Sequence, residues 1–236
     1  MDSERGRNKL LLFGANGAIG SALHEGFRQD GWDVVATSRH AVSGVDWLKV
    51  DPFASDFNPA LLDTGGKYTA VCWAQGANIN DSIYDVDPQK HLELYQANCL
   101  FIAVTLQLLL ARKLLAPASR LCVISSIWQN LARQNKFSYS VTKSALQGLV
   151  LSASADLAAD GHLINAILPG VLDTPMTRRN LTTQQIDAAS SATKFNRLPQ
   201  LKDVVSLASY LCSPKNTGIT GQFLAADLGF SHVRII

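Results

Sequence analysis

Short apolar segments rich in β-branched residues alternate with longer segments of helical periodicity along the whole chain. Most of the short segments lack alternating polar residues, as expected of parallel strands that are covered on both faces. We predict strands at residues 9–13, 33–37, 45–50, 69–74, 120–125, 163–168 and 222–226. We predict helices at residues 18–29, 88–113, 139–159 and 202–212.

This alternation predicts the fold class. Strands followed by helices over the full length favour an α/β fold with a single doubly wound parallel sheet of the Rossmann type, right-handed crossovers and helices on both faces. The sequence contains no internal repeat or low-complexity linker, so residues 1–236 are expected to form one domain. A ligand of such a sheet lies beyond the carboxyl ends of its strands.

Composition narrows the classes of function. The chain is 47% apolar, which is enough for a buried core and too high for a disordered protein. The net charge is +2 and no Lys/Arg tract is present, so we expect neither a nucleic acid nor an anionic membrane as partner. The longest apolar stretch, residues 99–111, is shorter than the ~20 residues of a bilayer span and favours a buried helix. The polar start of the chain is not typical of a signal peptide.

Cysteine and histidine usage gives no sign of a metal site. The four cysteines lie far apart within apolar segments, and the five histidines are scattered without metal-ligand spacing. We therefore expect buried thiols that pack as small apolar groups, without a disulfide framework or a bound metal. This pattern fits a reducing, cytoplasmic location.

A glycine-rich segment, GANGAIG at residues 14–20, directly follows the first predicted strand and opens a helix. Gly14 permits a tight turn, Gly17 or Ala18 keeps side chains away from a phosphate, and Gly20 lets the helix pack close to the sheet. The helix N-terminus adds free amides and a positive dipole end. Because no Gly-Lys-Ser/Thr follows, the segment predicts a dinucleotide site and not a P-loop.

The second predicted strand ends at Ser38 and Arg39, where a site for NAD usually carries an acidic residue that binds the ribose hydroxyls. A guanidinium pairs with a 2′-phosphate in a forked geometry, whereas a carboxylate repels it. We therefore expect NADP(H) as cofactor, with NAD(H) less favoured. The alternative is that Arg39 is only a solvated loop charge.

A third group combines Tyr139 and Lys143, one helical turn apart, with Ser126 at the end of a strand 13 residues earlier. The four-residue step places the phenol and the ammonium on one helical face. We expect the ammonium to favour the phenolate and so to fit Tyr139 for acid–base catalysis. Ser126 could donate a hydrogen bond to a substrate carbonyl.

With these segments in order, the chain resembles the short-chain dehydrogenase/reductase family over nearly its whole length. The family's turn, T-G-x-x-x-A/G-x-G, is matched at residues 14, 18 and 20, with Phe13 in place of the threonine. The resemblance implies that Ser126, Tyr139 and Lys143 are the catalytic residues. It adds Asn98 as the active-site asparagine, which helps to anchor a water that relays protons to the lysine.

The resemblance also implies where the cofactor binds. Pro169, Gly170 and Thr174 match the segment that contacts the nicotinamide end, and Asp51 matches the acid that approaches the adenine. The cofactor contacts that we expect are Gly14, Asn16, Gly17, Ala18, Ile19, Gly20, Ser38, Arg39, Asp51, Ala74, Gly76, Tyr139, Lys143, Pro169, Gly170 and Thr174.

Two departures from the family pattern stand out. The family's N-N-A-G is here Trp73-Ala74-Gln75-Gly76, so only the glycine matches, and we expect Trp73 to pack in the core. The short step from residue 39 to residue 51 leaves little room for a crossover helix, so we expect a bare loop near the adenine.

The sequence indicates less about the substrate than about the cofactor. Residues 175–200 are expected to form a mobile substrate lid, as in relatives. Trp128, Gln129 and Met176 are the candidate substrate contacts. Arginines in the lid and in the loop after Ser126 make an anionic or polyhydroxylated substrate conceivable, although surface arginines are common.

These patterns favour an NADP(H)-dependent oxidoreductase that interconverts a carbonyl and an alcohol on a small molecule. The alternatives are a non-catalytic NADP(H)-binding sensor or regulatory protein and a pteridine reductase. The intact Ser126, Tyr139, Lys143 and Asn98 argue against a sensor, and Ser126 argues against the pteridine reductase. By resemblance we expect a homodimer or homotetramer that forms through helices 88–113 and 139–159.

Overall fold

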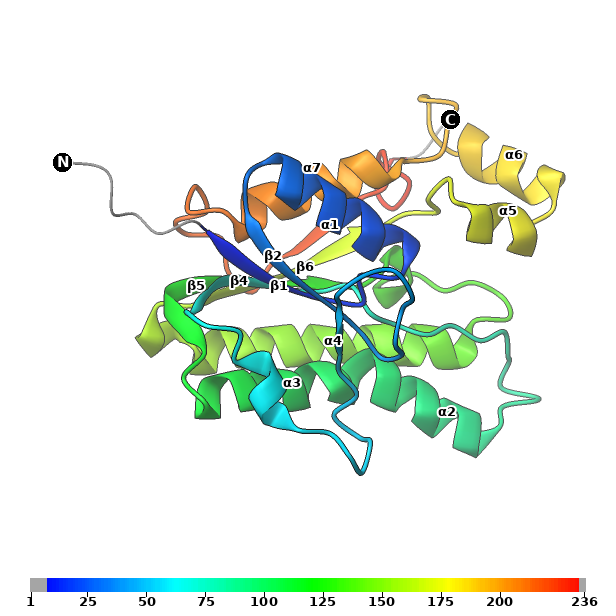
Figure 1. The fold of residues 1–236 in the computed structure, drawn as a ribbon. Coiled ribbons are helices and arrows are strands. Elements are labelled where there is room, and N and C mark those ends of the chain that lie inside the picture. The colour runs from blue at the N-terminus through cyan, green and yellow to red at the C-terminus, as the bar shows by residue number, and fades with distance from the viewer. Residues whose placement is uncertain (1–7, 234–236) are drawn as a thin grey trace.

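Seven parallel strands form one sheet in the computed structural model, which describes residues 8–233 and all their side chains except those of Met176 and Asn180 (Figure 1). The strands stand in the order β3-β2-β1-β4-β5-β6-β7. They are β1 Lys9–Phe13, β2 Asp33–Ser38, β3 Leu48–Lys49, β4 Tyr68–Trp73, β5 Leu115–Ile124, β6 Leu163–Pro169 and β7 Phe223–Ala226. The order reverses between β1 and β4, so the predicted doubly wound α/β fold is confirmed.

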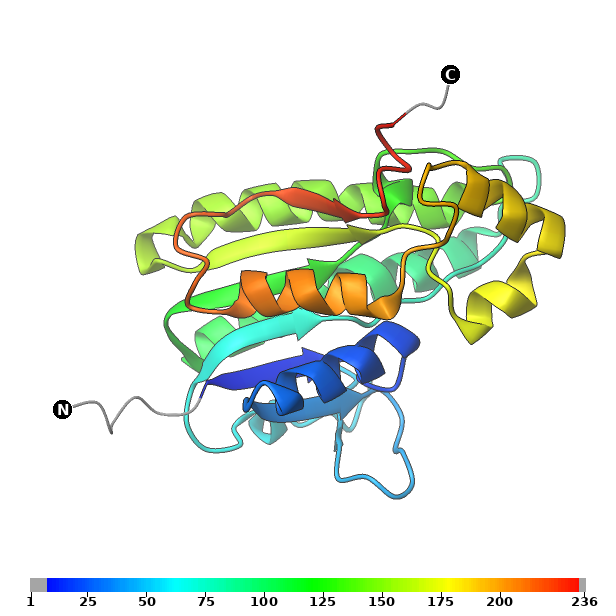
Figure 2. The same cartoon turned by 90° about the horizontal axis from the view of Figure 1, so that it is seen from above.

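Helices cover both faces of this sheet. Figure 2 shows α1 and α7 next to each other over one face, and Figure 1 shows α2, α3 and α4 beneath the other. The helices are α1 Ala18–Gln29, α2 Pro88–Tyr95, α3 Phe101–Ala111, α4 Phe137–Asp156, α5 Pro175–Asn180, α6 Thr183–Ser191 and α7 Leu201–Cys212. Short 3-10 turns lie at Pro59–Leu62, Ile127–Gln129 and Ala158–Asp160.

The core consists of two apolar clusters, one on each face of the sheet. The central strand β1 contributes to both, because Leu11 and Phe13 belong to the cluster beneath α3 and α4 whereas Leu10 and Leu12 belong to the one beneath α1 and α7. All four side chains are fully buried. Burial on both faces explains why the strands show no polar alternation. The four cysteine thiols are buried in these clusters, as the sequence predicts.

The predicted helix 88–113 is observed as α2 and α3, which are joined by the π-helical turn η2, Gln96–Leu100. By length and composition this 24-residue helix could cross a membrane. One of its faces lies in the core, where Phe101, Ile102 and Leu109 are buried. The π turn carries Asn98, and single π turns in α-helices are frequent at functional sites.

Two predicted segments differ in the structure. The strand predicted at residues 45–50 is only two residues long in the structure, where it is β3. Residues 45–47 do not pair with β2, and only Leu48 and Lys49 do. Residues 175–200, predicted as a lid and given no secondary structure in that prediction, contain α5 and α6. The bare loop predicted between residues 39 and 51 is confirmed, since no helix joins β2 to β3.

Candidate active site

A cavity of about 880 Å³ opens at the carboxyl ends of the strands. Its wall is built from the turns after β1, β4, β5 and β6, from the start of α4, and from α5, which Figure 1 shows at this end of the sheet. The predicted site residues that line it are Gly17, Ala18, Ile19, Ala74, Gly76, Ser126, Trp128, Tyr139, Lys143, Pro169, Gly170 and Thr174. Its volume lies within the roughly 300–1,000 Å³ of small-molecule and cofactor sites.

The glycine turn after β1 forms one end of the cavity. Gly14 adopts φ +76°, and a Cβ there would lie 2.5 Å from the backbone nitrogen of Gln75, so only glycine fits. A Cβ on Gly20 would lie 2.1 Å from the carbonyl oxygen of Gly14, which is why the helix packs so closely. Gly17 is the N-cap of α1 and gives it no side-chain cap. The first amides of α1 therefore face the cavity without an intrahelical partner.

Gln75 is a cavity residue that the sequence analysis did not assign. Both polar atoms of its side-chain amide are buried and have no hydrogen-bond partner among the described residues. An unpaired buried polar group costs about 1–3 kcal/mol, so a ligand with donors and acceptors stabilises this arrangement. The free amides of α1 and the Gln75 amide together fit the polar backbone of a dinucleotide.

Asn98 holds the loop after β4 against α4. Its side chain accepts a hydrogen bond from Ala77 N at 2.8 Å and donates to Ala77 O at 3.1 Å and to Thr142 Oγ1 at 2.9 Å. The side chain is buried and does not line the cavity. It also packs 3.1 Å from where a Cβ on Gly76 would lie, so the glycine allows this close approach. Asn98 therefore fixes the wall of the site through its side chain.

Ser126, Tyr139 and Lys143 meet at the centre of the cavity. Tyr139 lies in the first turn of α4, and the side chain of Ser126, just beyond β5, lies close enough to its phenol to lower the pKa of that phenol. Lys143 follows one turn later, with Nζ 5.7 Å from the ring centroid of Tyr139 and donating to Ile124 O at 3.2 Å. The structure thus brings together three residues that the sequence singled out from two separate segments.

Burial shifts the proton affinities of this pair. Burial raises the pKa of the Tyr139 phenol, and the nearby Ser126 side chain opposes that shift only in part. Burial also lowers the pKa of Lys143 to about 8. The expected lowering of the phenol pKa by Lys143 is not found in this structure, because burial removes water from around the phenolate and so decides the direction of the shift. At neutral pH the phenol keeps its proton and can donate it.

Lys136 is a second lysine beside Tyr139, and the sequence analysis did not single it out. Its Nζ lies 5.8 Å from the Tyr139 ring centroid and donates to Asn78 Oδ1 at 2.8 Å and to Asn80 Oδ1 at 2.5 Å. These bonds tie the loop after β4 to the start of α4. The run Asn-x-Asn-Asp at residues 78–81 is the only sequence signal of this contact.

The same loop is fastened a second time, by Asp81. Its carboxylate accepts a hydrogen bond from Ser138 N at 2.9 Å and another from Ser138 Oγ. Since Ser138 precedes Tyr139, these bonds hold the first turn of α4 in place. Both residues are buried.

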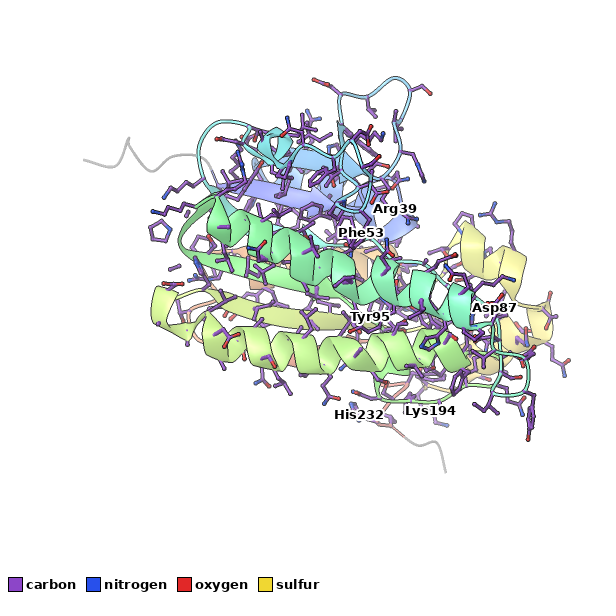
Figure 3. All side chains as sticks on the ribbon, turned by 90° about the horizontal axis from the view of Figure 1, so that it is seen from below. Arg39, Phe53, Asp87, Tyr95, Lys194 and His232 are labelled. Atoms are coloured by element: carbon purple, nitrogen blue, oxygen red, sulfur yellow. The ribbon has the colours of Figure 1, made fainter. Side chains whose placement is uncertain are left out.

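Residues predicted to hold the adenosine end lie outside the cavity wall, along β2 and the loops beside it. Ser38 is buried and its carbonyl accepts a hydrogen bond from Val50 N at 2.9 Å, which places Asp51 next to the end of β2. Asp51 Oδ1 accepts a hydrogen bond from Phe53 N at 3.1 Å and so caps a turn. Arg39 is exposed, and Figure 3 labels it and Phe53 at this edge of the sheet.

The segment after β6 closes the opposite side. Gly170 allows close approach of the C-terminal segment, since a Cβ there would lie 2.8 Å from Asp227 Cβ. Thr174 caps α5 through a hydrogen bond from Thr177 N to its hydroxyl at 3.2 Å. Both residues line the cavity, as does Pro169. These contacts set the wall at which the family resemblance implies a nicotinamide.

The remaining predicted contacts are dispersed. Trp128 lines the cavity and packs edge-to-face against Phe230, whereas Gln129 is buried and accepts a hydrogen bond from Ser125 Oγ at 2.8 Å. Asn16 is exposed and does not line the cavity, and the Met176 side chain lies outside the described residues. Among residues 8–233 no group of three or more His, Cys, Asp and Glu could hold a metal ion.

Comparison with known proteins shows similarity to reductases and dehydrogenases. A family model described as enoyl-(acyl carrier protein) reductase matches residues 63–231, and one described as RmlD substrate binding domain matches residues 8–93. The chain is 26% identical to cis-4-hydroxycyclohexanecarboxylate dehydrogenase of Sinomonas cyclohexanicum, over 91% of this chain and 88% of that protein. It is 35% identical to L-rhamnose 1-dehydrogenase (NADP(+)) of Thermoplasma acidophilum, over 47% of this chain and 44% of that protein.

A solved structure gives the same fold. Gluconate 5-dehydrogenase from Burkholderia cenocepacia, in complex with NADP and tartrate, aligns with a TM-score of 0.87. The alignment covers 97% of this chain and 96% of that chain at 22% identity. The arrangement of strands and helices described above is therefore that of known dehydrogenase structures.

Proposed function

The chain belongs to the short-chain dehydrogenase/reductase family of oxidoreductases, and from this premise we propose that it is an NADP(H)-dependent carbonyl reductase or alcohol dehydrogenase with Tyr139 as its acid–base group. The observation that carries the proposal is that the Tyr139 phenol and the Ser126 side chain lie close to each other in the wall of one cavity. A carbonyl oxygen that enters there meets two hydroxyl groups from different elements. Two donors on one oxygen stabilise the negative charge that develops on it during reduction.

Tyr139 supplies the proton in this proposal. Its raised pKa keeps the phenol protonated at neutral pH, which suits the reduction of a carbonyl to an alcohol. Ser126 orients the same oxygen and holds the phenol. Lys143, whose pKa of about 8 lies near working pH, can exchange protons with solvent and restore the phenol after turnover.

The cavity also has the groups that a nicotinamide dinucleotide needs. When bound, the cofactor supplies or accepts the hydride. The free amides at the start of α1 would hold the pyrophosphate, and the unpaired Gln75 amide would bind a polar group of the adjoining nucleotide. Lys143 would bind the ribose hydroxyls, and the backbone at Pro169 and Gly170 would face the nicotinamide.

Preference for NADP(H) rests on Arg39. Its guanidinium is exposed at the end of β2, and no described residue forms a hydrogen bond or ion pair with it. A 2′-phosphate is the partner that best suits a free guanidinium at this place. The NADP(+)-linked relative and the NADP-bound structure neighbour support this choice.

The proposal is tested by a substrate screen that follows NADPH absorbance. The screen presents ketones, sugars and pterins to the purified protein at saturating NADPH. Oxidation of NADPH with ketones or sugars is the expected result. Turnover of pterins alone points to a pteridine reductase. Tight NADPH binding without turnover of any carbonyl points to a sensor, and either outcome overturns the proposal.

We also propose that copies of the chain associate through α2, α3 and α4. Large apolar side chains are exposed on this side, at Leu92, Tyr95, Leu100, Val141 and Leu151. Figure 3 shows the continuous helix formed by α2 and α3 beside α4, with Tyr95 labelled, and α4 contacts α2 and the π turn between α2 and α3. Sedimentation at micromolar concentration is expected to show a dimer or tetramer, and a monomer would rule out this interface.

A further inference from the structure

The charged residues that line the cavity are all cationic. Its lining includes the four cationic residues Arg133, Lys136, Lys143 and Arg179. No Asp or Glu is among the described residues that line it. The surface elsewhere mixes both signs, and the whole chain carries only +2. A wall with cations alone attracts an anion.

Two of these four cations already have partners. Lys143 Nζ donates to Ile124 O and lies over the Tyr139 ring. Lys136 Nζ donates to the side chains of Asn78 and Asn80. Lys136 holds the loop beside Tyr139, and Lys143 is the residue that we propose for the ribose hydroxyls of the cofactor, so neither ammonium is left for the substrate.

The two arginines are different. Neither Arg133 nor Arg179 forms a hydrogen bond or an ion pair with any residue of the described part of the chain. Arg178, the neighbour of Arg179, pairs with Asp173 through two bonds, from Nε to Oδ1 at 2.8 Å and from Nη2 to Oδ2 at 2.9 Å. Of these adjacent arginines, the one outside the cavity is paired and the one in its wall is free.

Both free arginines line the same cavity as Tyr139. Arg133 lies close enough to Lys136 for its charge to lower the pKa of that lysine, and Lys136 itself lies 5.8 Å from the Tyr139 ring centroid. Arg179 belongs to α5, which begins next to the cavity residue Thr174. Arg133 therefore lies on the part of the cavity wall that Lys136 and Tyr139 form.

We infer that Arg133 and Arg179 bind an anionic group of the substrate, so that the enzyme acts on carbonyl compounds or alcohols that carry a carboxylate or a phosphate. This inference rests on the proposed function and names the substrate class for the same site. Guanidinium groups suit both anions, since their planar fork donates two parallel hydrogen bonds. The substrate is held by its anion between the loop before α4 and α5, with its carbonyl at Ser126 and Tyr139.

The experiment compares matched pairs of carbonyl compounds that differ in charge. They are acetoacetate and methyl acetoacetate, levulinate and methyl levulinate, and dihydroxyacetone phosphate and dihydroxyacetone. The ratio of kcat/KM for the charged over the neutral member is measured at saturating NADPH. It is measured for the wild type, Arg133→Gln, Arg179→Gln and the control Arg178→Gln.

The wild type is expected to prefer at least one charged member. Arg133→Gln and Arg179→Gln are each expected to lower that ratio roughly tenfold to hundredfold, the size of one charge-assisted hydrogen bond. Arg178→Gln should leave the ratio unchanged, and Arg179→Lys should keep part of the preference. Preference for the carboxylates or for the phosphate ester identifies the anion.

Three results would overturn the inference. The first is equal or better turnover of the neutral members by the wild type. The second is a ratio that the two glutamine variants do not change. The third is a loss of NADPH affinity, measured by its fluorescence, without a change in the ratio, because the arginines would then bind the cofactor.

Failure of the proposed function gives a distinct result. If no carbonyl is turned over, binding of levulinate and of methyl levulinate to the protein with NADP⁺ is measured by calorimetry. Binding of levulinate that is lost in Arg133→Gln and Arg179→Gln but kept in Arg178→Gln upholds the anion site. Equal binding of acid and ester, or binding of neither, refutes it.

Discussion

Replacing Lys143 by methionine should stabilise the protein at neutral pH while it abolishes the proposed catalysis. Lys143 is buried, and its pKa falls from 10.5 in the unfolded chain to about 8 in the folded protein. Below both values the lysine is charged in both states, and the folded state bears the full cost of the buried charge. That cost is about 3 kcal/mol, at about 1.4 kcal/mol for each unit of pKa.

The sign follows from proton linkage. Between pH 8 and pH 10.5 the unfolded chain binds the proton and the folded protein releases it, so the stability of the wild type rises with pH in this window. For these two pKa values the gain between about pH 7 and about pH 9.5 is roughly 2 kcal/mol. Methionine has a similar length and no charge, so the variant lacks this gain. Loss of the bond to Ile124 O offsets part of the stabilisation by a constant amount.

Urea unfolding of the protein without cofactor, at about pH 7 and about pH 9.5, measures the difference. The stability of Lys143→Met relative to the wild type should be about 2 kcal/mol more favourable at the lower pH. Lys202→Met, at an exposed position of α7, should show no such dependence. A Lys143→Met variant whose relative stability is the same at both pH values would refute the reasoning, because the lysine would then not be strained by burial.

Two further predictions concern other parts of the site. Arg39→Asp should weaken NADPH binding by at least about tenfold and leave NADH binding unchanged or stronger, because a carboxylate repels the 2′-phosphate. Binding of both cofactors is measured by fluorescence titration. Equal loss of affinity for both would show that Arg39 does not bind the 2′-phosphate. Asn98→Ala should lower the free energy of unfolding by about 2 kcal/mol or more, since Ala77 N, Ala77 O and Thr142 lose their hydrogen-bond partner. An unchanged midpoint of urea unfolding would show that these bonds do not hold the loop after β4.

The centre of the sheet was predictable because strands such as β1, β4 and β6 are buried on both faces, so their residues are apolar without polar alternation. The strands β1 and β6 and the helix α1 illustrate this, since their apolar runs and glycine boundaries are local features. The helix α6 was missed although Thr182 and Gln185 form a capping box. A capping box before a run with few apolar residues is a weak signal, because such a helix buries little surface.

The meeting of Ser126, Tyr139 and Lys143 in one cavity was predictable for a different reason. Ser126, Tyr139 and Lys143 depend on spacing within two short segments and on the order of strand and helix. Lys136 acts through hydrogen bonds to a loop far from it in the sequence, and Gln75 stands out only because its buried amide has no partner among the described residues. No local pattern marks either residue. The direction of the Tyr139 pKa was mispredicted because burial, which decides it, comes from the packing of the whole cavity.

The measurement that tests the account most directly is the rate of NADPH oxidation by Tyr139→Phe, with the best carbonyl from the screen. Loss of the phenol proton should lower kcat at least about a hundredfold, within the range of general acid catalysis. NADPH affinity should remain largely intact, and Tyr84→Phe, at a position that is 97% exposed, should behave as the wild type. Undiminished turnover by Tyr139→Phe would contradict the assignment of the phenol as the proton donor.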